Sequence, residues 1–206
     1  MGDAVVERWL AALLATPGLT AIRDPAEARR VHVDDALAAL PLVAGGPVVD
    51  VGSGGGSPGL PLAVVRPELR FDLLEATAKK CAFLRRWAAE LPNVEVVCAR
   101  AEEHAAAEGR DAYATALARA LAPPPAAVEW CLPLVRPGGR LVLYAAEEEG
   151  LADRVAAAAE QVAGRLAEVV SVPGSERRRL LVVEKTGPTP ERFPRRPGAA
   201  RKRPLA

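Results

Sequence analysis

The fold of this chain is decided by one stretch of sequence, Val48-Val49-Asp50-Val51-Gly52-Ser53-Gly54-Gly55-Gly56-Ser57-Pro58-Gly59. A short apolar run ends there in a turn rich in glycine, and a helical pattern follows at 61–65. Glycine permits positive φ angles and lets a ligand approach the backbone closely. Such a turn after a strand predicts a nucleotide-like ligand at the carboxyl edge of a parallel sheet.

The pattern around this turn alternates between strands and helices. Strand-like runs are predicted at 48–51, 70–74, 94–97, 112–117, 140–144, 166–172 and 180–183, and most of them are separated by helical patterns. This alternation predicts a mainly parallel, seven-stranded α/β sheet with helices on both faces. Before the sheet we expect a helix at 5–14 and a second at 24–40, with Asp24 as its cap and Pro25 at its first position.

The chain divides into three predicted segments. Residues 1–46 form a short N-terminal helical extension, and residues 47–186 form the main domain. Residues 187–206 are rich in Pro and Arg, so we expect a basic tail without regular structure outside the core.

Composition sets limits on the function. The 206 residues are 50% hydrophobic, which supports a packed core, and 27 Lys and Arg nearly balance 26 Asp and Glu. No run reaches the roughly 18 apolar residues of a membrane span, and the N-terminus does not read as a signal peptide. Three separated cysteines and two histidines argue against a disulfide framework or a metal site, and for the cytoplasm. His104 is expected to be exposed and Trp130 to pack internally.

Two classes of cofactor compete for the glycine-rich turn. Gly54, Gly56 and Gly59 match the dinucleotide fingerprint GxGxxG, which is weak evidence in a run so rich in glycine. Asp50 ends the strand just before the turn, where a carboxylate would repel a pyrophosphate and attract an ammonium group. S-adenosylmethionine carries an ammonium group and a sulfonium but no phosphate. The pattern Asp50-Val51-Gly52-x-Gly54-x-Gly56 therefore favours S-adenosylmethionine over a nicotinamide dinucleotide.

Carboxylates at the ends of the next two strands fit the same cofactor. Glu75 ends the second predicted strand, where acidic residues of dinucleotide folds accept hydrogen bonds from ribose hydroxyls. Glu102 follows the third strand and could face the adenine edge. The alternative is that both are acids favoured by the dipole at a helix N-terminus.

The segment 50–67 strongly resembles the bacterial 16S rRNA guanine-N7 methyltransferase family, called ribosomal small-subunit methyltransferase G and formerly glucose-inhibited division protein B. The similarity covers nearly the whole chain and includes the pair His32 and Asp35 and the segments 19–25, 75–84, 100–103, 118–120 and 192–205. It implies a Rossmann-like class I methyltransferase fold. It also implies methyl transfer from S-adenosylmethionine to N7 of a guanine in 16S rRNA of the small ribosomal subunit.

The resemblance also implies roles for particular residues. Carried over by position, the cofactor site comprises Gly52, Ser57, Glu75, Ala76, Thr77, Ala101, Glu102 and Arg119. We expect Arg119 to act in catalysis by positioning, because a fixed guanidinium can hold an oxygen of cofactor or substrate by paired hydrogen bonds. No general base is expected, because guanine N7 carries no proton.

Basic residues near the C-terminus suggest an RNA partner. We expect contacts with 16S rRNA or the 30S subunit from Arg195, Arg196, Arg201, Lys202, Arg203 and, by resemblance, His32. The alternative is a disordered tail that only aids solubility. We further expect no membrane partner and a monomer.

One departure from the family follows the strand that ends near Tyr144. The family usually has Lys-Gly there, whereas this chain has Ala145-Ala146-Glu147-Glu148-Glu149. Two alternatives therefore stay open, a non-catalytic relative that binds rRNA or the ribosome, and a methyltransferase with another substrate.

Overall fold

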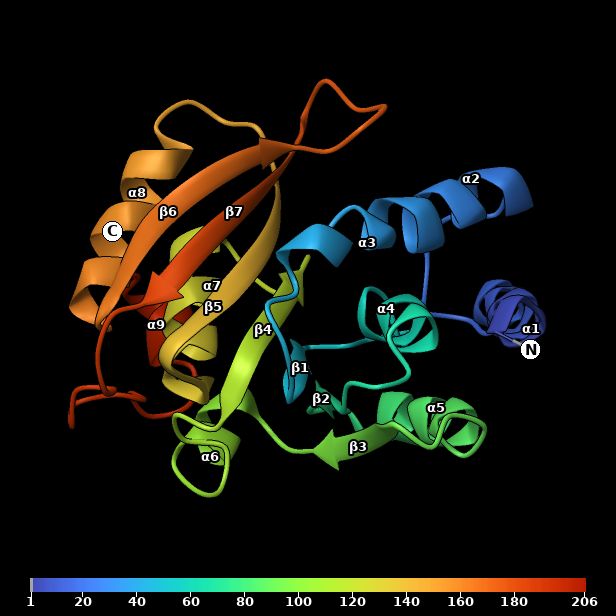
Figure 1. Ribbon diagram of the computed structural model, residues 1–206, viewed down its shortest axis with the longest axis horizontal. Coiled ribbons are helices and arrows are strands. Elements are labelled where there is room, and N and C mark those ends of the chain that lie inside the picture. The colour runs from blue at the N-terminus through green and yellow to red at the C-terminus, as the bar shows by residue number, and fades with distance from the viewer. Residues whose placement is uncertain (1) are drawn as a thin grey trace.

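One sheet organises the chain in a computed structural model that describes residues 2–206 (Figure 1). Its strands are β1 (Val48–Val51), β2 (Phe71–Glu75), β3 (Val94–Cys98), β4 (Tyr113–Arg119), β5 (Val135–Ala146), β6 (Gly164–Ser171) and β7 (Arg178–Lys185). They lie in the order β3-β2-β1-β4-β5-β7-β6, and β7 runs antiparallel to both neighbours. The prediction of a mainly parallel seven-stranded sheet is confirmed for these residues.

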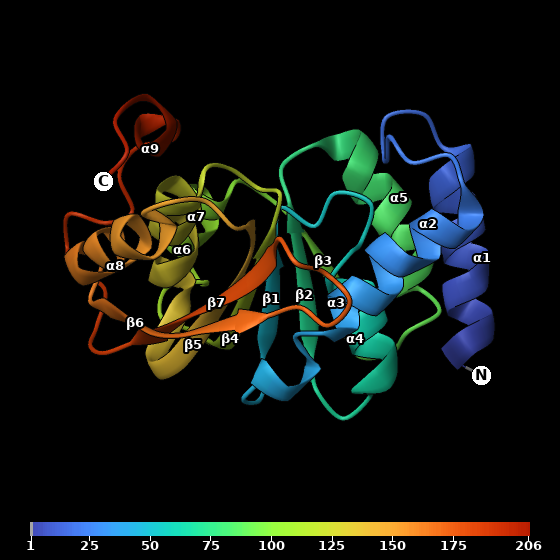
Figure 2. The same ribbon diagram turned by 90° about the horizontal axis from the view of Figure 1, so that it is seen from above.

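Helices cover both faces of the sheet (Figure 2). On one face lie α1 (Gly2–Ala15), α4 (Gly59–Val65) and α5 (Ala78–Ala88), and on the other lie α6 (Ala101–Ala105), α7 (Pro124–Cys131) with the 3₁₀ turn η3 (Leu132–Leu134), and α8 (Leu151–Gln161). Alternate residues of β1 enter the two cores, since Val48 packs with the first group and Val49 with the second. None of the helices described in residues 2–206 is long and apolar enough to cross a membrane.

The N-terminal segment packs against the glycine-rich turn. Trp9 of α1 is 1% exposed, and its Nε1–H donates to the carbonyl of Gly55 at 2.7 Å. The single helix expected at 24–40 is wrong in detail. Asp24 does cap a helix, but the segment is divided into α2 (Pro25–Arg29), the π-helical turn η1 (Arg30–Asp34), α3 (Asp35–Leu37) and the 3₁₀ turn η2 (Leu40–Leu42). A π-helical turn shifts the side chains that follow it relative to a regular helix, and such turns are frequent at functional sites.

The C-terminal tail is part of the packed structure, which corrects the expectation that it lies outside the core. Phe193 is 2% exposed, and Arg110 donates to its carbonyl at 2.7 Å. The buried Lys185 Nζ donates to Thr189 Oγ1 at 2.6 Å, which fixes the start of the tail. The tail ends in the short helix α9 (Ala199–Lys202). Proline content indicated irregular backbone correctly, but irregular backbone can still bury an aromatic side chain.

Two further expectations are wrong, the absence of disulfides and the exposure of His104. Cys81 and Cys98 form a disulfide bridge, because the parallel register of β2 and β3 places Cys98 beside Glu75 and α5 brings Cys81 back over the same point. His104 is buried rather than exposed, and its Nε2 lies 2.8 Å from the hydroxyl of Tyr113.

Replacing Phe193 tests the packing of the tail. We expect Phe193→Ala to lower the free energy of unfolding by about 3–5 kcal/mol, because it leaves an apolar cavity. Urea denaturation followed by circular dichroism measures this change. Glu191→Ala, at an exposed position of the same tail, is the matched control and should change little. Equal stabilities for the two variants would show that the tail is not anchored by Phe193.

Candidate active site

Two carboxylates accept hydrogen bonds from backbone N–H groups of the glycine-rich segment after β1. Gly52, Gly54 and Gly56 adopt positive φ angles of 71°, 57° and 108°, which side chains with a Cβ rarely adopt. The Glu75 carboxylate at the end of β2 accepts the N–H of Gly54 at 3.0 Å with Oε2 and the N–H of Thr77 at 2.8 Å with Oε1. Glu75 therefore ties the turn to the start of α5.

Asp50, at the end of β1, links the strand to the start of α4. It is 1% exposed, and its Oδ2 accepts the N–H of Gly59, the first residue of α4, at 3.0 Å. A Cβ on Gly59 would lie 2.8 Å from that oxygen, so only glycine fits there. Burial raises the pKa of Asp50 from 3.8 to about 7, although the Gly59 N–H and the charge of Arg119 oppose this.

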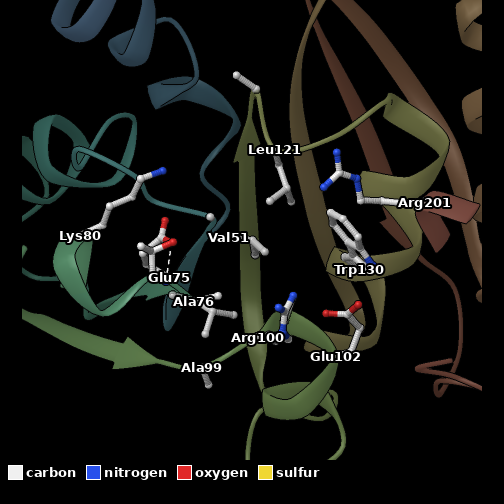
Figure 3. A pocket seen from close by; sticks show the side chains of 15 residues that line it. Val51, Glu75, Ala76, Lys80, Ala99, Arg100, Glu102, Leu121, Trp130 and Arg201 are labelled. Atoms are coloured by element: carbon white, nitrogen blue, oxygen red, sulfur yellow. Dashed lines mark hydrogen bonds between the residues drawn. The ribbon is translucent and has the colours of Figure 1, made fainter. Parts of the chain in front are cut away.

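A cavity of about 350 Å³ opens where the carboxyl ends of β1 to β4 meet (Figure 3). This is where the strand order reverses between β1 and β4, and open α/β sheets bind ligands at such a point. Six residues of the predicted cofactor site line the cavity, namely Gly52, Glu75, Ala76, Thr77, Ala101 and Glu102. The structure thus brings together predicted residues from three separate strand ends.

Other predicted site residues lie outside this cavity. Asp50, Gly54 and Gly56 are not among its lining residues and instead set the shape of the turn. The Ser57 hydroxyl donates to the carbonyl of His32 at 2.7 Å, which links the turn to η1. Direct contact between these residues and a cofactor stays a prediction.

Several lining residues were not predicted to belong to a cofactor site, since Arg201 was expected to contact RNA and Trp130 to pack internally. Lys80, Arg100, Leu121, Trp130 and Arg201 contribute to the walls, and Figure 3 shows Trp130 and Arg201 side by side on the wall opposite Lys80 and Glu75. Lys80 could have been found, since it is on the first turn of the helix that follows Glu75. Arg201 and Trp130 carried no such signal, because they reach the cavity only through the packing of α9 and α7.

The C-terminal tail thus forms one wall of the cavity. The N–H of Gly198, just before α9, donates to Glu102 Oε1 at 3.1 Å. Arg195 makes a two-pronged ion pair with Glu129, which is 2% exposed, and also donates to the carbonyl of Arg203. Of the arginines expected to contact RNA, Arg195 therefore has a structural partner and Arg201 lines the cavity. Arg196, Lys202 and Arg203 are exposed.

Arg119 lies at the end of β4 and is fixed by the N-terminal segment. Its guanidinium donates to the carbonyl of Val31 at 2.5 Å and to Nδ1 of His32 at 2.9 Å. Burial and the charge of Arg119 lower the pKa of His32 to about 4, so the imidazole is neutral. Because Nδ1 accepts, Nε2 carries the hydrogen and donates to Thr20 Oγ1 at 2.9 Å. His32 therefore orients Arg119.

Ala120, next to Arg119, lines two cavities. It has a positive φ of 52°, which is unusual for a residue with a Cβ. Ala120 lines the cavity described above and also a second one of about 420 Å³, which Arg119 and His32 line as well. A backbone held in an unfavourable region at such a junction is typical of functional sites.

The raised pKa of Asp50 predicts a pH dependence of stability. The unfolded chain loses this proton near pH 3.8 and the folded chain near pH 7, so the unfolded state binds fewer protons in between. The free energy of unfolding should therefore fall as pH rises through this window. In Asp50→Asn the free energy of unfolding should decrease less between pH 4 and pH 7 than in the wild type. Urea denaturation of the wild type and the variant at pH 4 to 8 measures this difference. Parallel pH profiles would contradict the prediction.

Comparison of the sequence with known proteins identifies the family of this chain. The family model described as rRNA small subunit methyltransferase G matches residues 7–182. A Ribosomal RNA small subunit methyltransferase G from Rubrobacter xylanophilus is 45% identical over 200 residues, covering 89% of this chain and 75% of that protein. The protein of that name from Moorella thermoacetica is 38% identical over 215 residues, covering 98% and 90%.

Solved structures share the fold. The 16S rRNA N2 G1207 methyltransferase of T. thermophilus, in complex with AdoMet and guanosine, has a TM-score of 0.57 at 21% identity and covers 85% of this chain and 42% of that one. Fibrillarin of Aeropyrum pernix, with natively bound S-adenosyl-L-methionine, has a TM-score of 0.57 at 13% identity, covering 73% and 76%. At these identities the likeness supports the fold alone. From its sequence relatives, the chain belongs to the rRNA small subunit methyltransferase G family.

Proposed function

We propose that this protein transfers a methyl group from S-adenosylmethionine to N7 of a guanine in 16S rRNA of the small ribosomal subunit. The observation that carries the proposal is the cavity at the reversal of strand order, where Glu75 and Glu102 stand beside the glycine-rich turn. Family membership supports the rRNA substrate, and the N7 specificity rests on the resemblance. We also propose that the protein acts as a monomer on the 30S subunit in the cytoplasm.

The residues of the cavity fit the methyl donor. Each Glu75 oxygen accepts one backbone N–H and keeps a lone pair that can accept a ribose hydroxyl. The flat side chain of Trp130 and the small Ala101 provide apolar surface for a base. Three cations, Lys80, Arg100 and Arg201, line the same cavity and would also suit a pyrophosphate. Titration with S-adenosylhomocysteine and with NADH separates these two ligand classes.

The chemistry needs positioning rather than a general base. When bound, S-adenosylmethionine supplies an electrophilic methyl group on a positively charged sulfur, and guanine N7 can accept it through a lone pair that carries no proton. Arg119 is half-buried and anchored by Val31 and His32, so it presents a fixed guanidinium to the second cavity. Fixed groups in a site shielded from water accelerate such a transfer by holding the reacting atoms in line.

The acidic segment after β5 is largely neutralised by neighbouring cations. Glu147 pairs with Arg179, and Glu148 pairs with Arg154 at 2.7 Å. These pairs reduce the repulsion of RNA phosphates that three adjacent acids would cause. The absence of the family's lysine after β5 is therefore weaker evidence for a non-catalytic protein than the sequence alone suggested.

Methyl transfer tests the proposal directly. Incubation of the protein with labelled S-adenosylmethionine and 30S subunits from cells lacking this modification should give one N7-methylated guanine in 16S rRNA. Mapping the modified nucleotide by chemical cleavage and mass spectrometry identifies it. If a family enzyme of known activity works under the same conditions and this protein transfers nothing, the proposal fails and the non-catalytic alternative stands.

Glu75→Gln tests the cofactor site. An amide has one acceptor oxygen, so one of the two N–H groups loses its partner and meets an NH₂ donor instead. We expect the Kd for S-adenosylhomocysteine to rise about tenfold or more, by calorimetry. Asp153→Asn, exposed on α8, is the charge-matched control. Unchanged affinity in Glu75→Gln would remove Glu75 from the cofactor site.

The exposed tail cations predict a salt dependence of RNA binding. Replacing Arg196 and Arg203 with Ala should reduce the slope of log K against log salt by about 1.4, since each phosphate contact with single strands contributes about 0.7. Filter binding to 16S rRNA at several salt concentrations measures the slope. Arg165→Ala, exposed on β6, should leave it unchanged. A slope that is the same in all three proteins would place RNA elsewhere.

A further inference from the structure

The second cavity combines apolar and aromatic walls with charged side chains. It has a volume of about 420 Å³ and lies at the ends of β4 and β5, under the segment formed by η1 and α3. Its walls are mostly apolar and include Val31, Ala145 and Val172. Tyr144 adds an aromatic wall whose position is fixed, because its hydroxyl donates to the carbonyl of Ala36 at 2.6 Å. Aromatic side chains are the usual stacking partners of unpaired RNA bases.

One carboxylate lines this cavity beside His32 and the arginines Arg119, Arg178 and Arg179. Asp35, the first residue of α3, lines the cavity and has a side chain only 10% exposed. Its charge is balanced by Arg178 of β7, whose side chain is 36% exposed. The β6–β7 hairpin extends toward α3 (Figure 2), which allows Arg178 of β7 to pair with Asp35 of α3. A buried charge without a partner is costly, so whatever removes Arg178 must replace it with other donors.

The two oxygens of a carboxylate match one base in particular. Guanine presents two neighbouring donors, N1–H and the N2 amino group, on one edge. Adenine and cytosine present a ring nitrogen acceptor there, which a carboxylate would repel. Uracil presents one N–H between two carbonyl acceptors. Guanine N7 lies on the opposite edge of the base, so a guanine held by its N1 and N2 groups leaves N7 free.

We propose that this cavity receives the target guanine and that Asp35 selects it by accepting hydrogen bonds from N1–H and N2–H. Arg178 leaves the carboxylate when the base enters and becomes available to a phosphate of the same RNA. Asp35 is thus a specificity-determining residue, and Ala120, which lines both cavities, marks the side toward which N7 faces. This inference rests on the proposed function, since it names the substrate site of that reaction.

Mononucleotide binding tests the inference without methyl transfer. Titrating the protein, saturated with S-adenosylhomocysteine, with GMP, IMP and AMP by NMR gives three affinities that share the same phosphate contribution. IMP lacks only the N2 amino group, so we expect GMP to bind about tenfold more tightly than IMP, as one hydrogen bond to a charged group provides. AMP should bind more weakly than IMP.

Two substitutions separate selection from a structural ion pair. Asp35→Asn should abolish the preference for GMP over IMP, whereas Arg178→Ala should keep it, because the carboxylate remains. A merely structural pair would be disturbed equally by either change. Asp34→Asn, exposed beside Asp35, is the matched control. Circular dichroism and the Kd for S-adenosylhomocysteine confirm that each variant is folded.

The outcomes are distinct from those of the methylation experiment. Equal affinities for GMP, IMP and AMP, no binding of GMP, or a preference that survives Asp35→Asn would each overturn the inference. A preference for GMP that depends on Asp35 would support it even if 30S subunits were not methylated. Methylation of 30S subunits by Asp35→Asn at the wild-type rate would contradict it while leaving the proposed function intact.

Discussion

The candidate site depends on one carboxylate that receives two backbone N–H groups. Glu75 accepts from Gly54 in the turn after β1 and from Thr77 at the start of α5, so it joins two strand ends of the sheet. Glycine can adopt many backbone conformations. Without these hydrogen bonds, the glycine-rich turn could therefore change its conformation at little cost in free energy. The same carboxylate faces the cavity, so the group that shapes the site also offers acceptors to a ligand.

Segments before and after the sheet complete this site. The N-terminal segment supplies His32, which orients Arg119, and Trp9, which holds the glycine-rich turn. The C-terminal tail supplies Arg201 and an N–H for Glu102. Neither segment therefore acts as a simple appendage, although the division of the chain into three segments stays a prediction. RNA that contacts the tail would touch a wall of the proposed cofactor cavity.

Errors in the sequence-based expectations share a physical origin. Cys81 and Cys98 are 17 residues apart and belong to no recognised sequence motif. The pairing of β2 with β3 brings them together. His104 has acids and alanines as neighbours in sequence, yet α6 turns it toward the hydroxyl of Tyr113. Phe193 lies among prolines and arginines, yet its side chain joins an apolar core cluster, and its carbonyl accepts from Arg110, more than 80 residues earlier. Each of these contacts joins distant parts of the chain.

By itself, the sequence determined the seven strands and the mainly parallel sheet that they form. It also determined the glycine-rich turn and the carboxylates at the ends of β2 and β3. Those features are written in local periodicity and in residues a few positions apart, which the backbone converts directly into elements. Only the tertiary structure decided that Arg201 lines the cavity at the reversal of strand order and that Asp35 lines the second cavity. Both residues lie in segments outside the sheet, one before β1 and one after β7, which pack back against one edge of it, and no local pattern encodes that meeting.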